Sequence, residues 1–303
     1  MQTFGFDDNK KMNNTIVTIG KFDGIHKGHE KLLEILKQNA NGRQKVVLTF
    51  EAAPSVFLKE EESKTIVTEQ EKKLLLEELG VDVYIKMPLT KEFLAMSPEE
   101  FIEKVLKEKL GATTIVCGTD FHFGSKAAGD VKFLEEHQKQ FEYSLIVVEK
   151  EQYNHRDISS SVIRELIARG EMLEVNRLLD HPYRIIGRVQ EGKQLGRTID
   201  IPTANLIPEK TKLLPPNGVY RTEVVVEGIR YHGISNVGVN PTVENGKQIK
   251  VETHIIDFKE YIYHEVVEVQ FFGFIRPERK FENLEELQKQ IQEDIKACQK
   301  LQK

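Results

Sequence analysis

The chain is poor in cysteine and has no tryptophan. Its two cysteines among 303 residues, Cys117 and Cys298, lie far apart in the sequence. Such a pair is no disulfide framework, which favours a reducing compartment and predicts a cytoplasmic protein. No run approaches the ~20 apolar residues of a membrane span, and the polar segment Met1–Asn14 lacks the apolar core of a signal peptide. We therefore expect no membrane partner.

An excess of positive charge is also lacking. Lysine and arginine number 43 against 48 aspartates and glutamates, which gives a formal net charge of -5. Nucleic-acid-binding domains usually carry a basic surplus, so we expect small-molecule substrates and no nucleic-acid partner. The phosphate-binding pattern Gly-x4-Gly-Lys-[Ser/Thr] is missing, which excludes a P-loop. The composition leaves the oligomeric state open.

The first half of the chain alternates strand and helix patterns. Short apolar runs predict strands, and the segments between them predict helices, one of which begins with a capping box at Ser97 and Glu100. This alternation indicates a parallel sheet, whose ligands bind at the carboxyl ends of the strands. The predicted strands are Thr15–Ile19, Val46–Phe50, Val81–Lys86, Thr113–Cys117 and Ser144–Val148.

The segment Gly20–His29 is the most informative part of this half. It links the first predicted strand to an amphipathic helix and places His26 and His29 on the same side of that helix's first turn. A helix N-terminus offers free N–H groups and positive potential to an anion, and the glycines let the backbone approach a ligand. The segment therefore predicts a nucleotide-phosphate site. The alternative is a pair of ordinary surface histidines.

The pattern changes near residue 180. Closely spaced runs of strand character, separated by Gly, Pro and Asn, predict an antiparallel β-barrel, and the tail Glu282–Lys303 predicts a helix with apolar Leu284, Leu287 and Ile291. We therefore expect two domains, 1–180 and 181–303. The predicted strands of the second are Tyr183–Val189, Val219–Val226, Tyr231–Val239, Lys250–Ile256 and Val266–Phe274.

Two further motifs in the first half carry candidate ligand-binding groups. Gly118–Gly124 follows a strand, and in it Asp120 could bind a ribose hydroxyl or orient a metal-bound phosphate, while Phe121 and Phe123 could line a ring pocket. The alternative is an Asp-containing turn with core aromatics. Ile158–Arg164 opens a helix, in which Ser159 and Ser160 could bind phosphate or simply cap the helix.

The ordered motifs resemble those of the bacterial bifunctional riboflavin kinase/FMN adenylyltransferases, or FAD synthetases. That family carries G-x-F-D-G-x-H-x-G-H, T-F-x-P-H-P, G-x-D/N-F-x-F-G and S-S-T-x-I-R in this order. The chain departs from the second motif, where Ala52 and Ala53 replace Pro and His, and mildly from the fourth, where Ser161 replaces Thr. The resemblance implies a Rossmann-like α/β nucleotidyltransferase domain followed by a riboflavin-kinase-like barrel.

The resemblance implies that the FMN phosphate attacks the α-phosphorus of ATP to give FAD and pyrophosphate. Neither reacting phosphate has a proton to lose, so positioning and charge neutralisation suffice. His26 and His29 would stabilise the phosphates, Arg164 with Ser159 and Ser160 would hold the pyrophosphate, and Mg²⁺ would bridge phosphate oxygens. The remaining ATP-loop residues are Gly20, Phe22, Asp23, Gly24 and Gly28.

The second half carries the family's kinase signature in altered form. Thr203 and Asn205 of Pro-Thr-Ala-Asn match residues that hold Mg-ATP, and Glu252 matches the base that accepts the riboflavin hydroxyl proton. An outward-facing strand residue is the alternative for Glu252. Residues that depart from the kinase motifs are Asp180, His181, Asp200, Ile201, Asn240, Val243 and His264.

These departures predict a kinase that is weaker than the adenylyltransferase. Asp200 replaces a glycine beside the expected triphosphate, and like charges about 4 Å apart repel by about 4 kcal/mol at an effective dielectric constant of 20. The first alternative is a fully bifunctional enzyme that makes FMN from riboflavin and then FAD. A nucleotidyltransferase that uses another acceptor is the second, and a non-catalytic flavin-binding protein is the third.

Overall fold

The computed structural model describes residues 1–6, 8, 11–50, 64–191, 202–242 and 246–300. The chain forms two compact units. The first comprises Met1–Ser63 and Glu69–Ser159, and the second comprises Lys64–Thr68 and Ser160–Lys303.

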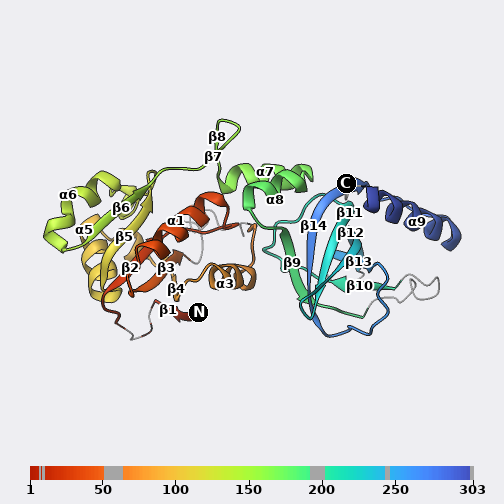
Figure 1. Cartoon of the computed structure of the whole chain (residues 1–303), viewed down its shortest axis with the longest axis horizontal. Coiled ribbons are helices and arrows are strands. Elements are labelled where there is room, and N and C mark those ends of the chain that lie inside the picture. Colours follow the sequence, from red (N-terminus) through yellow and green to blue (C-terminus); the bar gives the residue numbers. More distant parts are fainter. Residues whose placement is uncertain (7, 9–10, 51–63, 192–201, 243–245, 301–303) are drawn as a thin grey trace. The chain divides into compact units, whose positions relative to one another are not determined.

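The first unit is built on a six-stranded sheet in the order β1-β4-β3-β2-β5-β6 (Figure 1). Every pair of neighbouring strands in it is parallel, as the alternating pattern predicts. The strands are β1 (Gln2–Gly5), β2 (Thr15–Ile19), β3 (Gln44–Phe50), β4 (Val83–Met87), β5 (Ala112–Gly118) and β6 (Ser144–Val148).

The strand order reverses beside β2. The chain runs outward from β2 through β3 to β4, and then crosses back so that β5 pairs with the other side of β2. Loops at the carboxyl ends of such neighbouring strands diverge and leave a crevice, which is where open α/β sheets bind ligands. The loops after β2 and β5 therefore flank the switch point of this sheet.

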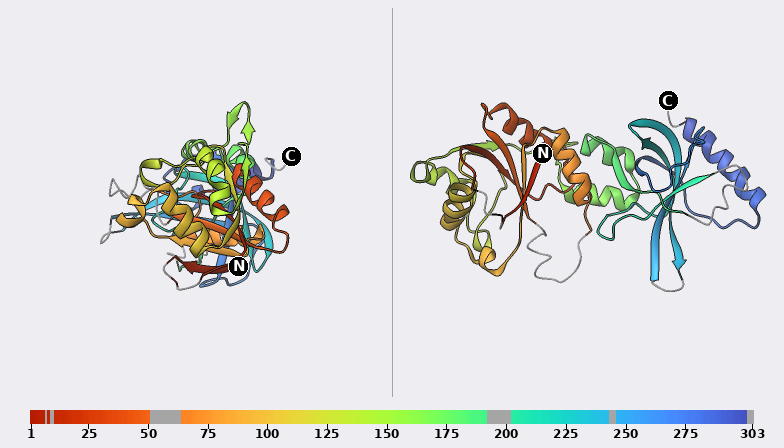
Figure 2. Two further views of the ribbon diagram at one scale, coloured as in Figure 1. Left: turned by 90° about the vertical axis from the view of Figure 1, so that its left-hand side faces the viewer. Right: turned by 90° about the horizontal axis from the view of Figure 1, so that it is seen from below.

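Helices cover both faces of this sheet (Figure 2). The predicted capping box is confirmed, because the Ser97 hydroxyl accepts from the Glu100 N–H and the Glu100 carboxylate accepts from the Ser97 N–H. The helices are α1 (Lys27–Gln38), α3 (Glu69–Glu78), α4 (Lys91–Ala95), α5 (Pro98–Glu100), the π-helix η1 (Phe101–Lys109), the 3₁₀ turn η2 (Ser125–Ala127) and α6 (Val131–Phe141). A short hairpin of β7 (Gln152–Tyr153) and β8 (Arg156–Asp157) follows.

The second unit is an antiparallel half-barrel with helices at its start and end. Its sheet runs β10-β13-β12-β11-β14-β9, and Gln190 donates its N–H to the Asn205 carbonyl at 2.8 Å to join the first and last strands. Its elements are α7 (Ser160–Arg169), α8 (Met172–Leu179), β9 (Tyr183–Arg188), β10 (Thr203–Leu206), β11 (Gly218–Val226), β12 (Ile229–Thr242), β13 (Gly246–Ile255), β14 (Val266–Arg276) and α9 (Leu284–Lys300).

The structure confirms the predicted fold class and all ten predicted strands, with ends shifted by a few residues. The sequence does not predict strands β1, β7, β8 and β10, because each has only two to four residues and little alternation. No helix among the described residues is long and apolar enough to cross a membrane.

Candidate functional site

The loop between β2 and α1 holds the first set of predicted site residues. Three of its residues have positive φ, namely Phe22 at 47°, Gly24 at 94° and Ile25 at 45°. Phe22 and Ile25 are fully buried, and this burial offsets the cost of a backbone conformation that side chains other than Gly rarely adopt. The turn delivers His26 to the N-cap of α1, where its side chain forms no capping hydrogen bond.

The two histidines lie against each other at the start of α1. Their rings stack with centroids 3.8 Å apart, and the Phe22 ring lies 4.9 Å from that of His29. The absence of a side chain at Gly28 matters here, because a Cβ would lie 3.3 Å from the His26 ring. Among the described residues, neither His26 Nδ1 nor His29 Nδ1 has a hydrogen-bond partner, although both atoms are buried. These buried, unpartnered nitrogens beside a helix N-terminus suit an anionic ligand.

Burial keeps both imidazoles neutral. Desolvation lowers the pKa of His26 to about 4, although the nearby Asp23 carboxylate opposes the shift. Desolvation also lowers the pKa of His29 well below its usual range, and the charges of His26 and Lys72 add to this effect. A bound phosphate would reverse the balance, because its negative charge favours protonated imidazole.

The lowered pKa of His26 predicts a loss of stability in mild acid. Between pH 6.5 and pH 4 the unfolded chain binds a proton at His26 that the folded chain does not, so the free energy of unfolding falls as the pH falls. From pH 7 to pH 5 this loss is about 2 kcal/mol. Urea unfolding of the wild type and of His26→Gln at both pH values measures it. An equal pH dependence in the two proteins would contradict the prediction.

The loop after β5 lies beside the histidine loop across the switch point. Asp120 forms an ion pair with Lys150 at 3.0 Å. Phe121 and Phe123 stack with centroids 5.5 Å apart, and Phe123 packs in the core against Phe101. The packing of Phe123 matches the core-aromatic alternative, and the ligand roles of Asp120 and Phe121 stay predictions.

The residues predicted to hold pyrophosphate are divided between the two units. Ser159 ends the first unit, whereas Ser160 and Arg164 belong to the second, so their place beside the histidines stays a prediction. Arg164 lies in the first turn and a half of α7, and its guanidinium donates to the Lys64 carbonyl at 2.6 Å. Ala52 and Ala53 lie outside the described residues.

The half-barrel brings the predicted kinase residues onto neighbouring strands. On β10, Asn205 is paired in register with Glu252 of β13, and Thr203 lies two residues earlier on the same face. Asn236 of β12 is paired with Glu252 from the other side. Glu252 is half-buried, and no hydrogen bond or ion pair of its carboxylate is seen among the described residues. A carboxylate between two asparagines that forms no hydrogen bond or ion pair with the described residues suits a proton acceptor.

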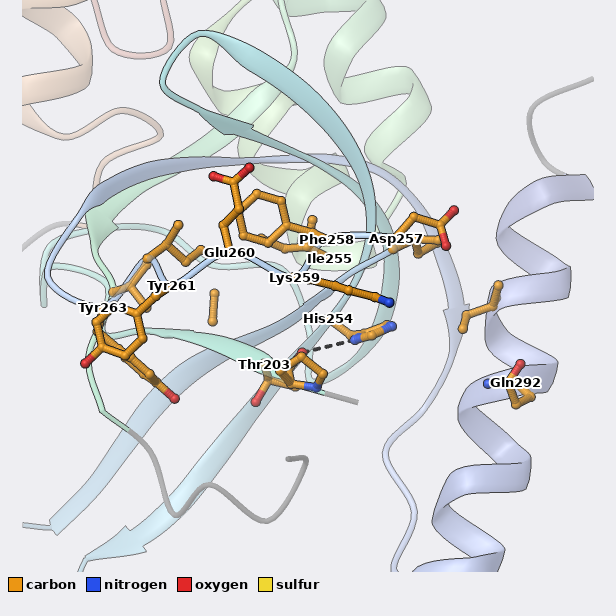
Figure 3. A pocket seen from close by; sticks show the side chains of 16 residues that line it. Thr203, His254, Ile255, Asp257, Phe258, Lys259, Glu260, Tyr261, Tyr263 and Gln292 are labelled. Carbon is orange, nitrogen blue, oxygen red and sulfur yellow. Dashed lines mark hydrogen bonds between the residues drawn. The ribbon is translucent and has the colours of Figure 1, made fainter. Parts of the chain in front are cut away.

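A pocket of about 890 Å³ adjoins Thr203 (Figure 3). Thr203 and His254 lie together on its wall, where His254 Nδ1 contacts the Pro202 carbonyl at 3.0 Å. The segment Asp257–Tyr263 forms another wall, and Gln292 of α9 contributes from the side. Asn205 and Glu252 do not line this pocket. Its size suits a nucleotide or flavin.

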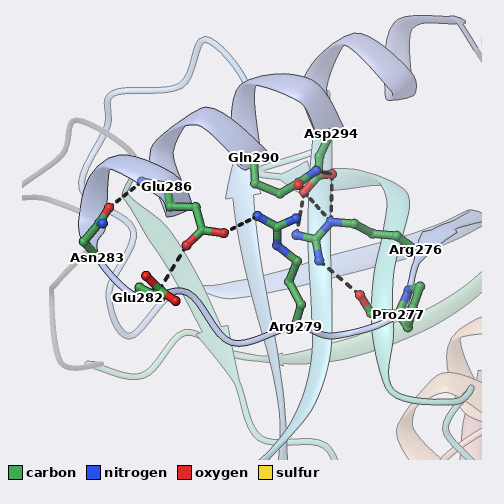
Figure 4. A network of polar contacts seen from close by, with 8 residues as sticks. All are labelled: Arg276, Pro277, Arg279, Glu282, Asn283, Glu286, Gln290 and Asp294. Carbon is green, nitrogen blue, oxygen red and sulfur yellow. Dashed lines mark hydrogen bonds and ion pairs between the residues drawn. The ribbon is translucent and has the colours of Figure 1, made fainter.

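Helix α9 is held to the sheet by a bidentate ion pair (Figure 4). Arg276 Nε and Nη2 donate to the Asp294 carboxylate at 2.9 and 2.8 Å, and Gln290 donates to the same carboxylate at 3.0 Å. The Asp294 side chain is only 3% exposed, so this pair is shielded from water, whereas the nearby Arg279–Glu286 pair is well exposed.

Asp294→Ala is therefore expected to lower the free energy of unfolding of the second unit by about 2 kcal/mol, because it leaves a part-buried guanidinium without its partner. Glu286→Ala is the matched control and should change it by less than about 1 kcal/mol. Denaturant unfolding measures both. Equal effects of the two substitutions would show that burial of the Arg276–Asp294 ion pair does not add to the stability of the second unit.

Two departures from the kinase motifs occupy backbone positions that favour glycine. Asp180 ends α8 with φ of 63°, and His264 has φ of 67°. Glycine is usual at such positions because it adopts positive φ without strain, and both residues here keep that conformation. The backbone of Asn240 belongs to β12, while Asp200, Ile201 and Val243 lie outside the described residues.

Sequence reasoning missed Lys72 of α3, which lies beneath the histidine loop. Its Nζ donates to the Lys21 carbonyl at 3.0 Å. One signal could have found it, since Lys72 falls on the buried side of its helix, three and four residues before Leu75 and Leu76. No group of three or more His, Cys, Asp or Glu side chains that could hold a metal occurs in the described ranges.

A stacked histidine pair with buried Nδ1 atoms at the switch point of a parallel sheet, followed in the chain by an antiparallel half-barrel, defines a nucleotidyltransferase-like protein with an added barrel unit. The FAD synthetase family matches residues 8–162, and the riboflavin kinase family matches residues 179–302. The chain belongs to the bifunctional riboflavin kinase/FMN adenylyltransferase family.

Relatives of that description match along nearly the whole chain. The one from Listeria monocytogenes is 34% identical over 285 residues, which cover 93% of this chain and 90% of the relative. The one from Haemophilus influenzae is 35% identical over 296 residues, covering 96% and 95%. A crystal structure described as a macrolide-efflux protein from Streptococcus pneumoniae has a TM-score of 0.89 at 30% identity and covers 99% of each chain.

Proposed function

We propose that the chain makes FAD in two steps, one in each of the predicted domains 1–180 and 181–303. In the second domain, the riboflavin hydroxyl would attack the γ-phosphorus of ATP and release ADP, which gives FMN. In the first, an FMN phosphate oxygen would attack the α-phosphorus of a second ATP, and the bond to the leaving pyrophosphate would break. The observation that carries the proposal is the stacked His26–His29 pair, whose two buried Nδ1 atoms have no partner among the described residues.

For the adenylyl transfer, we propose that His26 and His29 stabilise charge on the phosphates. Neutral imidazoles can donate hydrogen bonds and become protonated as an anion enters, so they need not act as nucleophiles. Gly20, Asp23 and Gly24 of the predicted ATP loop would bind the nucleotide. Ser159, Ser160 and Arg164 would bind the departing pyrophosphate, with Arg164 exchanging the Lys64 carbonyl for phosphate oxygens.

For the kinase step, we propose that Glu252 accepts the proton of the riboflavin hydroxyl and that Thr203 and Asn205 bind Mg-ATP. The common face of Thr203, Asn205 and Glu252 supports this assignment. The hydroxyl and amide oxygens of Thr203 and Asn205 suit Mg²⁺, which commonly takes few protein ligands besides phosphate oxygens. Mg²⁺ would neutralise charge on the transferred phosphate. We propose residue 180 as the boundary between the adenylyltransferase domain and the kinase domain.

The comparisons support full bifunctionality better than a weakened kinase. Retention of positive φ at Asp180 and His264 also supports it, because at these two positions the departures keep the backbone conformation. Purified protein supplied with Mg-ATP and either riboflavin or FMN, with products separated by chromatography, tests both steps. Failure of the folded protein to make FAD from FMN would refute the first activity, and failure to phosphorylate riboflavin would refute the second.

A further inference from the structure

Lys72 is a buried lysine that contacts the histidine loop from α3. Its side chain is only 9% exposed, and its Nζ donates to the carbonyl oxygen of Lys21 at 3.0 Å. The same carbonyl accepts a hydrogen bond from Thr49 Oγ1, at the end of β3, at 3.2 Å. One peptide group at the start of the loop is therefore held by donors from two neighbouring elements.

The loop that follows this peptide needs such support. Phe22 and Ile25 keep positive φ although neither is glycine. Such conformations persist only where several surrounding contacts hold the backbone in place. The Lys21 carbonyl directly precedes Phe22, so its orientation sets where the strained turn begins. This strained turn places His26 at the N-cap of α1, where its ring stacks on that of His29.

We propose that Lys72 is a positioning residue for adenylyl transfer: its ammonium group fixes the Lys21 peptide and thereby holds the His26–His29 pair in the geometry that meets the phosphates. This inference rests on the function proposed for the first unit. Lys72 acts through the loop and is not placed in contact with the substrate.

The charges around Lys72 suit this role. Burial lowers the pKa of the ammonium group, while Glu69 and Asp23 favour its charged form and Lys21 and Lys86 oppose it. Asp23 is itself in the loop and almost fully buried. Glu69 lies 3.9 Å from Lys86 and contacts the Tyr84 hydroxyl at 3.4 Å. The charged lysine is thus embedded among partners rather than exposed as a free surface cation.

Lys72 also acts electrostatically on the pair. Together with His26, its positive charge lowers the pKa of His29, in addition to the larger effect of burial. Removal of that charge should therefore raise the pKa of His29. A lysine elsewhere in the unit would leave this pKa unchanged, so the titration tests whether the charge of Lys72 acts on the pair, while kcat tests whether Lys72 positions it.

The test compares Lys72→Met, Lys72→Arg and Lys73→Met in the full chain. Lys73 is the matched control, because it is the next residue of α3, its side chain is 43% exposed, and its Nζ lies 3.9 Å from Glu69. We expect Lys72→Met to lower kcat for FAD formation about 10- to 100-fold, as misplaced catalytic groups do. Lys73→Met should change kcat by less than about twofold. Lys72→Arg keeps a charged donor and should recover much of the loss.

Further readouts complete the test. NMR titration of the histidine rings without substrate should show a higher pKa for His29 in Lys72→Met and no change in Lys73→Met. Phosphorylation of riboflavin by the same samples reports whether the second unit is folded, and thermal unfolding reports whether the first unit, which contains Lys72, is folded. If the wild type makes FAD and folded Lys72→Met makes it at an unchanged kcat, the inference about Lys72 is overturned, whatever the His29 titration shows. If the wild type makes no FAD, the proposed function itself fails.

Discussion

His29→Ala is expected to lower kcat for FAD formation about 10²- to 10³-fold, the usual effect of removing one preorganised group that stabilises charge in the transition state. The substitution removes the ring that stacks on His26 at 3.8 Å and one of two buried nitrogens without a partner among the described residues. Because His29 Nδ1 has no hydrogen-bond partner among the described residues, the substitution breaks no hydrogen bond of that atom, and its cost in stability is that of the lost ring packing. Steady-state kinetics with FMN and Mg-ATP measure the effect.

His155→Ala serves as the control, since His155 lies in the exposed turn between β7 and β8. It should leave kcat unchanged. Riboflavin phosphorylation by the same His29→Ala sample checks that the second unit is intact, and its thermal unfolding checks the first. A His29→Ala protein that makes FAD at a near-normal rate would show that His26 and His29 are ordinary histidines at the start of a helix.

Glu252→Gln is expected to lower kcat for riboflavin phosphorylation about 10²- to 10⁴-fold, because a hydroxyl nucleophile must lose its proton and an amide cannot accept it. The substitution keeps the size of the side chain and its place between Asn205 and Asn236. KM for ATP and riboflavin should change little, since the loss concerns a step after binding. Formation of FMN from riboflavin under saturating Mg-ATP gives the measurement.

Glu223→Gln on β11 is the matched control, because Glu223 is also a half-buried strand glutamate of the same sheet. It should retain kinase activity, and both variants should still convert FMN to FAD. If Glu252→Gln phosphorylates riboflavin as fast as Glu223→Gln, then Glu252 is only an outward strand residue and the proton acceptor lies elsewhere.

The sequence alone was sufficient for features that depend on near neighbours in the chain. The apolar run Thr15–Ile19, the glycines after it and the amphipathic helix that follows predict a strand, turn and helix with His26 and His29 together, and the structure has them so. The capping box at Ser97 and the change from alternating helices and strands to closely spaced strands are likewise local patterns. They determined the fold class of both halves.

Only the tertiary structure decided which distant segments meet. Local periodicity does not specify strand order, and the pairing of β5 with β2 places Asp120 across the switch point from the histidines. The burial of the imidazoles of His26 and His29, which keeps them neutral, depends on packing around the loop.

Single contacts of the candidate sites were also decided by the tertiary structure. The hydrogen bond of Lys72 to Lys21 joins residues 51 positions apart. Register between β10, β12 and β13 sets Glu252 between Asn205 and Asn236. Such contacts are long-range, so their formation depends on the whole packed unit rather than on any one segment.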